Sequence, residues 1–187
     1  MAVTLTTSSL TAWIDNMAGW VLVEKGEDQS GLQQILKGIA TAEAVGGNIG
    51  RAMQRMFLAR SYAHTGQRAA GLAAAEDALA WMESNDVRLL EAEARRLKGE
   101  LLLIDHSSPA EAGEAASVTT AEACFRQAIE VARRQGARWW ELRATVSLYR
   151  LAVKAGAAGA ASGAEAGEGD CIGERSQSMD RQPSIES

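Results

Sequence analysis

The apolar positions of the chain follow a helical spacing along most of its length. Apolar and small residues recur three or four positions apart, and no run alternates apolar and polar residues beyond the short MAVTLTT segment at the start. Turn-forming stretches such as GEDQ, GGN and SND separate the helical segments. The pattern predicts helices over residues 9–25, 29–45, 49–65, 68–83, 87–104, 119–135 and 137–155.

A set of small residues recurs every 40 positions. Gly19 is followed three positions later by Leu22 and then by Gly26, and this order repeats downstream. The spacing of three puts the first two residues on one helix face, where the small residue lets a neighbouring helix approach. The glycine suits the left-handed turn that often ends a helix. The corresponding positions of the later units are Ala59, Tyr62, Gly66, Gly99, Leu102, Tyr149 and Gly156.

A second helix follows in each complete unit, with small and apolar residues four and seven positions apart. This stripe faces the first helix, so each unit is a helical hairpin that cannot bury its apolar faces alone. In the third unit the offset changes from 40 to 50, because residues 105–118, which include Pro109, form a loop insertion. The stripe residues that define the second helices are Gly71, Ala78, Ala121, Phe125 and Ala128.

Stacking of these hairpins predicts an all-α fold, a right-handed α-solenoid of about three and a half helical hairpins. The repeat domain covers residues 9–156 and follows a short N-terminal extension over residues 1–8. Residues 157–187 are rich in alanine, glycine, serine and charged residues, which predicts a disordered low-complexity tail. The fourth hairpin therefore lacks its second helix.

The last predicted helix has an apolar face with nothing to cover it. An exposed apolar edge normally marks an interface or an aggregation site, so we expect a surface open to self-association at this end of the repeats. The face is formed by Leu142, Val146, Tyr149 and Val153.

Composition and charge narrow the function classes. The 187 residues carry a net charge of −5 and no basic stripe, which disfavours a nucleic-acid partner. No apolar run reaches the roughly 18 residues that a membrane span requires, and no secretory signal is recognisable, so we expect a cytoplasmic protein with no membrane partner. Cys124 and Cys171 are interpreted as free thiols, and Cys124 as a small buried thiol rather than a reactive nucleophile.

Catalytic and cofactor sites have little support. No G-x-x-x-x-G-K-[ST] phosphate loop is present, and GGNIG at 46–50 is interpreted as an interhelical turn rather than an anion site. His64 lies at a helix end, and His106 forms no catalytic triad with its chain neighbours Asp105 and Ser107. No metal ligands have a useful spacing. We therefore expect no catalytic residue, no cofactor and no metal.

The repeated positions resemble the tetratricopeptide (TPR) pattern, although the period is longer than the usual length of about 34 residues. They are similar to the longer-period TPR-like arrays at the C-terminus of bacterial signalling ATPases, including LuxR-type ATP-dependent transcription activators and adenylate/guanylate cyclase–ATPase fusions. The resemblance covers residues 10–156 and rests on EAEARRLKGELLL, AEACFRQAIEVARRQGARWWELRATVSLYRL and GLAAAEDALAWMES. The ATPase, cyclase or DNA-binding module of such proteins has no counterpart in this sequence.

The resemblance implies a non-catalytic protein-interaction or regulatory module, a fragment or remnant of a signalling ATPase or transcription regulator. Such a module binds a peptide, a protein or a sister signalling module. The alternative is a part of an adenylate/guanylate cyclase or ATPase, a nucleotide-dependent signalling enzyme whose catalytic modules are absent here, and a third reading is a non-functional remnant. The concave face of the first helices is the expected binding surface, lined by Gln54, Arg55, Arg60, Arg96 and Glu100.

Two further groups have both a structural and a binding interpretation. Trp139 and Trp140 cannot face the same side of a helix, so one should pack on the preceding hairpin and the other should lie at its rim. Either serves as a core residue or as an anchor for a partner. The arginines near Arg96 and Arg134 are interspersed with glutamates, which favours ion pairs along the helices over a patch for an acidic ligand.

Overall fold

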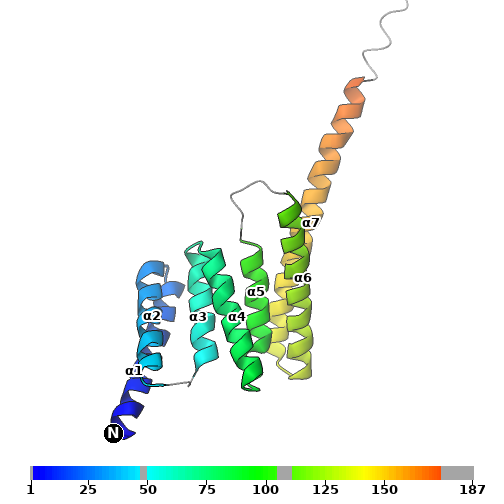
Figure 1. Cartoon of the computed structure of the whole chain (residues 1–187). Coiled ribbons are helices and arrows are strands. Elements are labelled where there is room, and N and C mark those ends of the chain that lie inside the picture. Colours follow the sequence, from blue (N-terminus) through cyan, green and yellow to red (C-terminus); the bar gives the residue numbers. More distant parts are fainter. Residues whose placement is uncertain (1, 47–49, 105–110, 174–187) are drawn as a thin grey trace, which may run out of the picture. The chain divides into compact units, whose positions relative to one another are not determined.

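The structure is a computed structural model that describes the backbone of residues 2–46, 50–104 and 111–173. The surroundings of side chains are described for residues 7, 9–46, 50–104 and 116–156. The described residues form seven α-helices and no strands, which confirms the predicted all-α class (Figure 1). The helices are α1 (Ala2–Glu24), α2 (Asp28–Ala44), α3 (Arg51–His64), α4 (Arg68–Ser84), α5 (Glu91–Leu102), α6 (Glu111–Arg134) and α7 (Arg138–Gly173).

The chain divides into two compact units, Met1–Leu148 and Tyr149–Ser187. The first unit contains α1 to α6 and the first turns of α7. Helices that are neighbours in sequence pack as antiparallel pairs there, α1 with α2, α3 with α4 and α5 with α6 (Figure 1). The second unit contains the remainder of α7.

The turns between the helices have the same backbone conformation at matching positions. Gly26 and Gly66, which are 40 residues apart, have φ values of 86° and 71°. Two residues before these glycines α1 and α3 end, and the amide after each glycine, in Glu27 and Gln67, donates to a carbonyl five residues earlier, at 2.9 and 2.8 Å. This closure satisfies a carbonyl that the helix end would otherwise leave unpaired. Positive φ also recurs after the second helices, at Gly46, Asp86 and Gly136.

Small residues let the two helices of each hairpin approach closely. A Cβ atom on Gly19 would lie 2.7 Å from the Gly31 carbonyl of α2, and one on Gly99 would lie 2.5 Å from the Phe125 ring of α6. A Cβ on Gly71 of α4 would lie 3.2 Å from the Ala59 carbonyl of α3. The other small residues of the repeat, and the ring of Phe125, are completely buried: Ala59, Ala78, Ala121, Phe125 and Ala128.

The main apolar core of the first unit runs through α1 to α5. Val23, Ile35, Leu58 and Leu101 belong to one buried cluster, against which Leu36 and Tyr62 pack from the side. The stacked rings of Trp20 on α1 and Phe57 on α3, with centroids 5.4 Å apart, add an aromatic contact between successive first helices. The apolar side chains of each hairpin therefore pack both between its own two helices and against the neighbouring hairpin.

Two segments expected to be irregular are helical. α1 begins at Ala2, within the expected extension over residues 1–8, and α6 begins at Glu111, within the expected loop over residues 105–118. Alanine and glutamate dominate the sequence EAGEAAS at the start of α6, and both have high helix propensity. Residues 105–110, which include His106 and Pro109, lie outside the described residues.

The C-terminal boundary also differs from the prediction. α7 continues through Gly156, where the first helix of the fourth hairpin was expected to end, and reaches Gly173. A helix interior tolerates glycine at a cost of about 1 kcal/mol relative to alanine, and the many alanines of this segment offset that cost. The expected disorder from residue 157 is thus replaced by helix up to Gly173, and residues 174–187 lie outside the described part of the chain.

Candidate interaction site on the first helices

Charged side chains from four successive first helices gather within the first unit. We call these residues the charged cluster. Arg60 of α3 lies 2.8 Å, through Nε, from Oε1 of Glu24 on α1. The cluster is formed by Glu24, Arg60, Glu93, Arg96, Glu100 and Arg143.

Arg96 of α5 is the buried centre of the charged cluster. Its Nε and Nη2 donate to the two carboxylate oxygens of Glu93, at 2.8 and 2.7 Å, and its Nη1 pairs with Glu100. Ser147 of α7 donates to the same oxygen of Glu100 at 3.0 Å. Burial alone lowers the pKa of Arg96, but hydrogen bonds and charges from Glu93 and Glu100 outweigh it and raise the pKa. The guanidinium therefore stays charged and ties α5 to α7.

Arg143 brings a second guanidinium onto Glu93, from α7. Its Nη1 lies 2.9 Å from Glu93 Oε1, and its side chain keeps 28% of its surface exposed. The pKa of Arg143 is lowered, chiefly by burial of its side chain. The negative charge of Glu93 opposes this change, and the positive charges of Arg96 and Arg60 add to it. Three guanidinium groups therefore act on one another in this region, two of them, in Arg60 and Arg143, within reach of solvent.

The guanidinium of Arg60 has a buried nitrogen that lacks a hydrogen bond despite its ion pair. Its Nε is buried and makes no hydrogen bond, although Glu24 lies 2.8 Å away, because the two groups are poorly aligned. A third of the Arg60 side chain is exposed. Arg60 and Arg143 thus each keep part of their side chain exposed.

The predicted partner-contacting residues divide into two groups. Gln54 and Arg96 are 5% and 3% exposed, so the prediction that they line an open surface is wrong: close helix packing covers both. Arg55 is mostly buried between Glu43 of α2 and Asp77 of α4, each at 2.7 Å, and acts as a structural link. The half-exposed members are Arg60 and Glu100.

The two adjacent tryptophans face different surroundings. Trp140 packs against Ala92, Val131 and Ala132, and the Arg143 guanidinium lies 5.6 Å from the centre of its ring. Trp139 is 63% exposed. Trp140 thus contacts Arg143 of the charged cluster, and Trp139 is the member of the pair that a partner can reach.

The apolar face of α7 is open. Leu142 and Val146, in the first unit, are 55% and 37% exposed, and Tyr149 and Val153, in the second, are 68% and 50% exposed. These values confirm the expected exposure of this face. α1 also exposes large apolar side chains, at Leu10, Ile14 and Val21.

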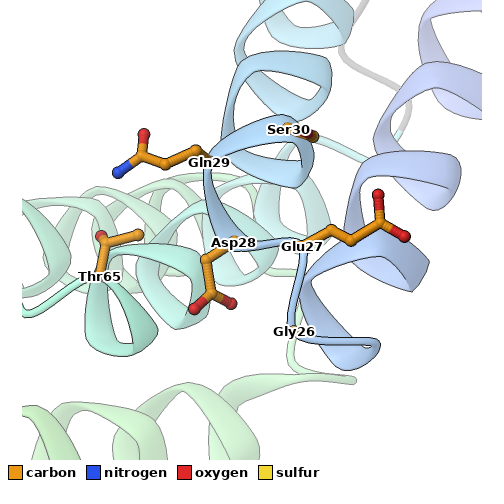
Figure 2. Close-up of a pocket in the computed structure, with 6 residues that line it drawn as sticks. All are labelled: Gly26, Glu27, Asp28, Gln29, Ser30 and Thr65. Atoms are coloured by element: carbon orange, nitrogen blue, oxygen red, sulfur yellow. The ribbon is translucent and has the colours of Figure 1, made fainter.

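A shallow hollow of about 470 Å³ lies at the turn between α1 and α2, beside the end of α3 (Figure 2). Figure 2 shows the carboxyl groups of Glu27 and Asp28 pointing in different directions, so they do not converge on one ligand. His64 Nδ1 lies 3.5 Å from Asp28 Oδ1. Negative side chains at the start of α2 disfavour an anion there. The lining residues are Gly26, Glu27, Asp28, Gln29, Ser30 and Thr65.

The structure describes some of the other groups that the sequence offered for a chemical role. Cys124 is buried as a free thiol, and burial raises its pKa against the opposing effects of Lys98 and Arg95. In the described part of the chain, no three His, Cys, Asp or Glu side chains come together as a metal site, and no helix has the length and apolarity to cross a bilayer. The GGNIG residues 47–49 and the side chain of Cys171 lie outside the described residues.

Sequence reasoning found part of the charged cluster. Arg60, Arg96 and Glu100 were predicted as residues that line the concave face of the first helices. Glu93 is three positions before Arg96, a spacing that signals an ion pair. Arg143 and Glu24 were missed, since their partners lie on other helices. No protein-family model and no curated protein matches the sequence.

Proposed function

We propose that the chain is a non-catalytic helical-repeat module that binds a protein or peptide. The repeat is supported by turns of equal conformation at offsets of 40 and 50 residues, at Gly26 and Gly66 and at Gly46, Asp86 and Gly136. It is also supported by close helix pairing at Gly19 and Gly99. TPR-like hairpins of this kind stack as a right-handed solenoid, and we assign that arrangement to α1 through the start of α7.

The binding surface is the exposed side of the charged cluster, with Arg60, Glu100 and Arg143. The observation that carries this assignment is the pairing of two guanidinium groups, those of Arg96 and Arg143, with one buried carboxylate, Glu93, in an otherwise alanine-rich core. Buried charges add little net stability, so their concentration at one place favours a role in specificity or binding. A carboxylate of a partner would relieve the repulsion between Arg60 and Arg143 and accept charge-assisted hydrogen bonds from both.

The resemblance to the C-terminal arrays of signalling ATPases supports a regulatory role in the cytoplasm, as a fragment or remnant of such a protein. A nucleotide-dependent enzyme remains the alternative. Incubation of the purified chain with Mg²⁺ and ATP or GTP separates the two. The binding module gives no phosphate or cyclic nucleotide above the buffer control, whereas turnover that scales with protein concentration would establish the enzyme.

The binding proposal is tested with peptides selected on the full chain. A random peptide library displayed on phage is panned against the immobilised protein, and the enriched peptides are synthesised for fluorescence anisotropy. We expect acidic or C-terminal carboxylate groups in these peptides. Arg60→Ala/Arg143→Ala should weaken their binding by at least about tenfold, since hydrogen bonds between charged groups contribute about 1.5–3 kcal/mol.

Arg126→Ala is the matched control, because Arg126 is an exposed arginine that pairs with Glu122 of its own helix and lies outside the charged cluster. It should leave the affinity within about twofold. Thermal denaturation of each variant establishes that the fold persists. Failure to enrich any peptide, or equal binding by the double variant and the wild type, contradicts the proposed surface.

A further inference from the structure

The exposed face of α7 occupies the position at which the earlier first helices contact their own second helix. On α1, this position comprises Ala12, Asn16, Gly19 and Val23, all buried, with Gly31 and Gly38 of α2 against them. The matching positions 40 residues later are 52, 56, 59 and 63 of α3. Those 80 residues later are 92, 96 and 99 of α5 and Leu103, which follows its last residue; all but 63 and 103 are buried. The next members of this series, at the offset of 50 set by the third unit, are Leu142, Val146, Tyr149 and Val153.

The face of α7 is therefore built to receive a helix, but a helix with a different surface. In the third hairpin the first helix contributes the small residue, Gly99, and the second helix contributes the large one, Phe125. On α7 the corresponding residue is Tyr149, which is large and 68% exposed. A helix that packs here must place small residues opposite Tyr149.

The chain itself carries such a helix. Beyond Gly156, α7 continues over residues 157–173, a stretch as long as α2 and α4, which have 17 residues each. Eleven of its 17 residues are alanine or glycine, and small residues stand at 156, 160, 163 and 167, in the spacing that continues the apolar face. Because α7 is one uninterrupted helix, this stretch cannot fold back onto the face that precedes it.

The charges of the two halves of α7 are complementary. Residues 138–156 contain four basic residues and one glutamate, whereas residues 157–173 contain three acidic residues and no basic one. Two copies of α7 in parallel would place like charges together, and an antiparallel pair places each basic half beside an acidic half. The basic residues are Arg138, Arg143, Arg150 and Lys154, and the acidic residues are Glu165, Glu168 and Asp170.

From these observations we propose that a second copy of the chain covers the apolar face of α7. Two α7 helices pair antiparallel about a two-fold axis near Gly156, so that the alanine- and glycine-rich half of each lies on the apolar face of the other. With the axis at Gly156, Tyr149 of one copy stands opposite Gly163 of the other, and Val153 stands opposite Gly159. The interface is isologous and closed, so it gives a dimer and not a filament. It is separate from the peptide-binding surface and does not depend on that assignment.

Charge exchange between the two halves of α7 tests this dimer on the full chain. One variant, Arg150→Glu/Lys154→Glu, makes both halves acidic, and the other, Glu165→Lys/Glu168→Lys, makes both basic. Size-exclusion chromatography with light scattering should give twice the 19.8 kDa chain mass for the wild type and the single-chain mass for each variant alone. An equimolar mixture of the two variants should restore the dimer, since each basic half again meets an acidic one.

Lys25→Glu/Arg126→Glu is the control, with the same change in charge at exposed positions outside α7. It should remain dimeric. A monomeric wild type at about 100 µM, well above the Kd of a stable homodimer, overturns the proposal. Persistence of the dimer in both α7 variants, or a mixture that stays monomeric, overturns it as well. Circular dichroism of every variant separates loss of pairing from loss of fold.

Discussion

The carboxylate of Glu93 on α5 lies 2.9 Å from the guanidinium of Arg143 on α7, and it also accepts two hydrogen bonds from Arg96. One buried acidic side chain therefore holds two cations from different helices. This arrangement fixes where α7 starts against α5, and it leaves Arg143 partly exposed beside Arg60. The ion pairs that join α5 to α7 and the proposed binding surface thus share residues.

Arg96→Ala should destabilise the protein by about 3–5 kcal/mol, because it leaves the buried negative charge of Glu93 with less positive charge beside it. Urea denaturation followed by circular dichroism at 222 nm measures this loss. Glu93→Gln/Arg96→Met removes both charges at similar volume and should recover at least half of the loss. A loss below about 1 kcal/mol in the free energy of unfolding of Arg96→Ala would show that the buried ion pair contributes little to stability.

Gly99→Ala should destabilise the third hairpin by about 1–3 kcal/mol, since the new methyl group meets the Phe125 ring at 2.5 Å. Phe125→Leu should lose stability through its own cavity, but Gly99→Ala/Phe125→Leu should be more stable than the sum of the two losses predicts. Thermal and urea denaturation of the single and double variants give this coupling. Strict additivity would contradict a direct contact between the two positions.

Asp86→Gly should stabilise the protein by about 0.5–1 kcal/mol. Asp86 has a φ of 51° at the position where the other hairpins have Gly46 and Gly136, and glycine adopts this conformation without steric cost. The exposed pair of Asp86 with Arg88 contributes little against this gain. Gly136→Ala tests the same turn in the opposite direction and should be destabilising. A fall in the midpoint of unfolding for Asp86→Gly would contradict this prediction.

Cys124 should react slowly with a thiol reagent in the native protein and make stability depend on alkaline pH. Burial raises the pKa of its thiol, so the native state keeps the proton that the unfolded state releases. The stabilisation is present below the unfolded pKa of about 8.5 and is lost as the pH rises through the folded pKa. Denaturant midpoints from pH 7 to 10 in a Cys171→Ser background measure it, and Cys124→Ala should flatten the profile. Rapid native-state labelling at pH 8 would contradict burial.

Local signals in the sequence predicted the helix ends well. Gly26 and Gly66 mark the ends of α1 and α3, because a left-handed residue at these positions has a clear preference for glycine. Alanine-rich segments were harder to interpret: the alternation with glycine beyond Gly156 predicted disorder, whereas the structure continues α7 to Gly173. Helix propensity and backbone entropy oppose one another there, and composition alone does not determine the balance.

The charged cluster was only partly predictable. Arg96 and Glu100 share one helix, so their spacing was visible, but burial of Arg96 follows from the packing of α5 against α6 and α7. The pairing of Glu93 with Arg143 joins residues 50 positions apart, a separation that residue types alone do not specify. The residues most relevant to binding therefore required the three-dimensional arrangement.

We propose that the chain binds a partner through the exposed side of the charged cluster. The most direct measurement is a titration of the 15N-labelled protein with a selected acidic peptide, followed by amide chemical shifts. We expect the largest perturbations at Arg60, Glu100 and Arg143, and we expect the amide shifts of Gly26 to Ser30 to remain unchanged. Perturbations confined to the hollow between α1 and α2, or spread evenly over all helices, would contradict it.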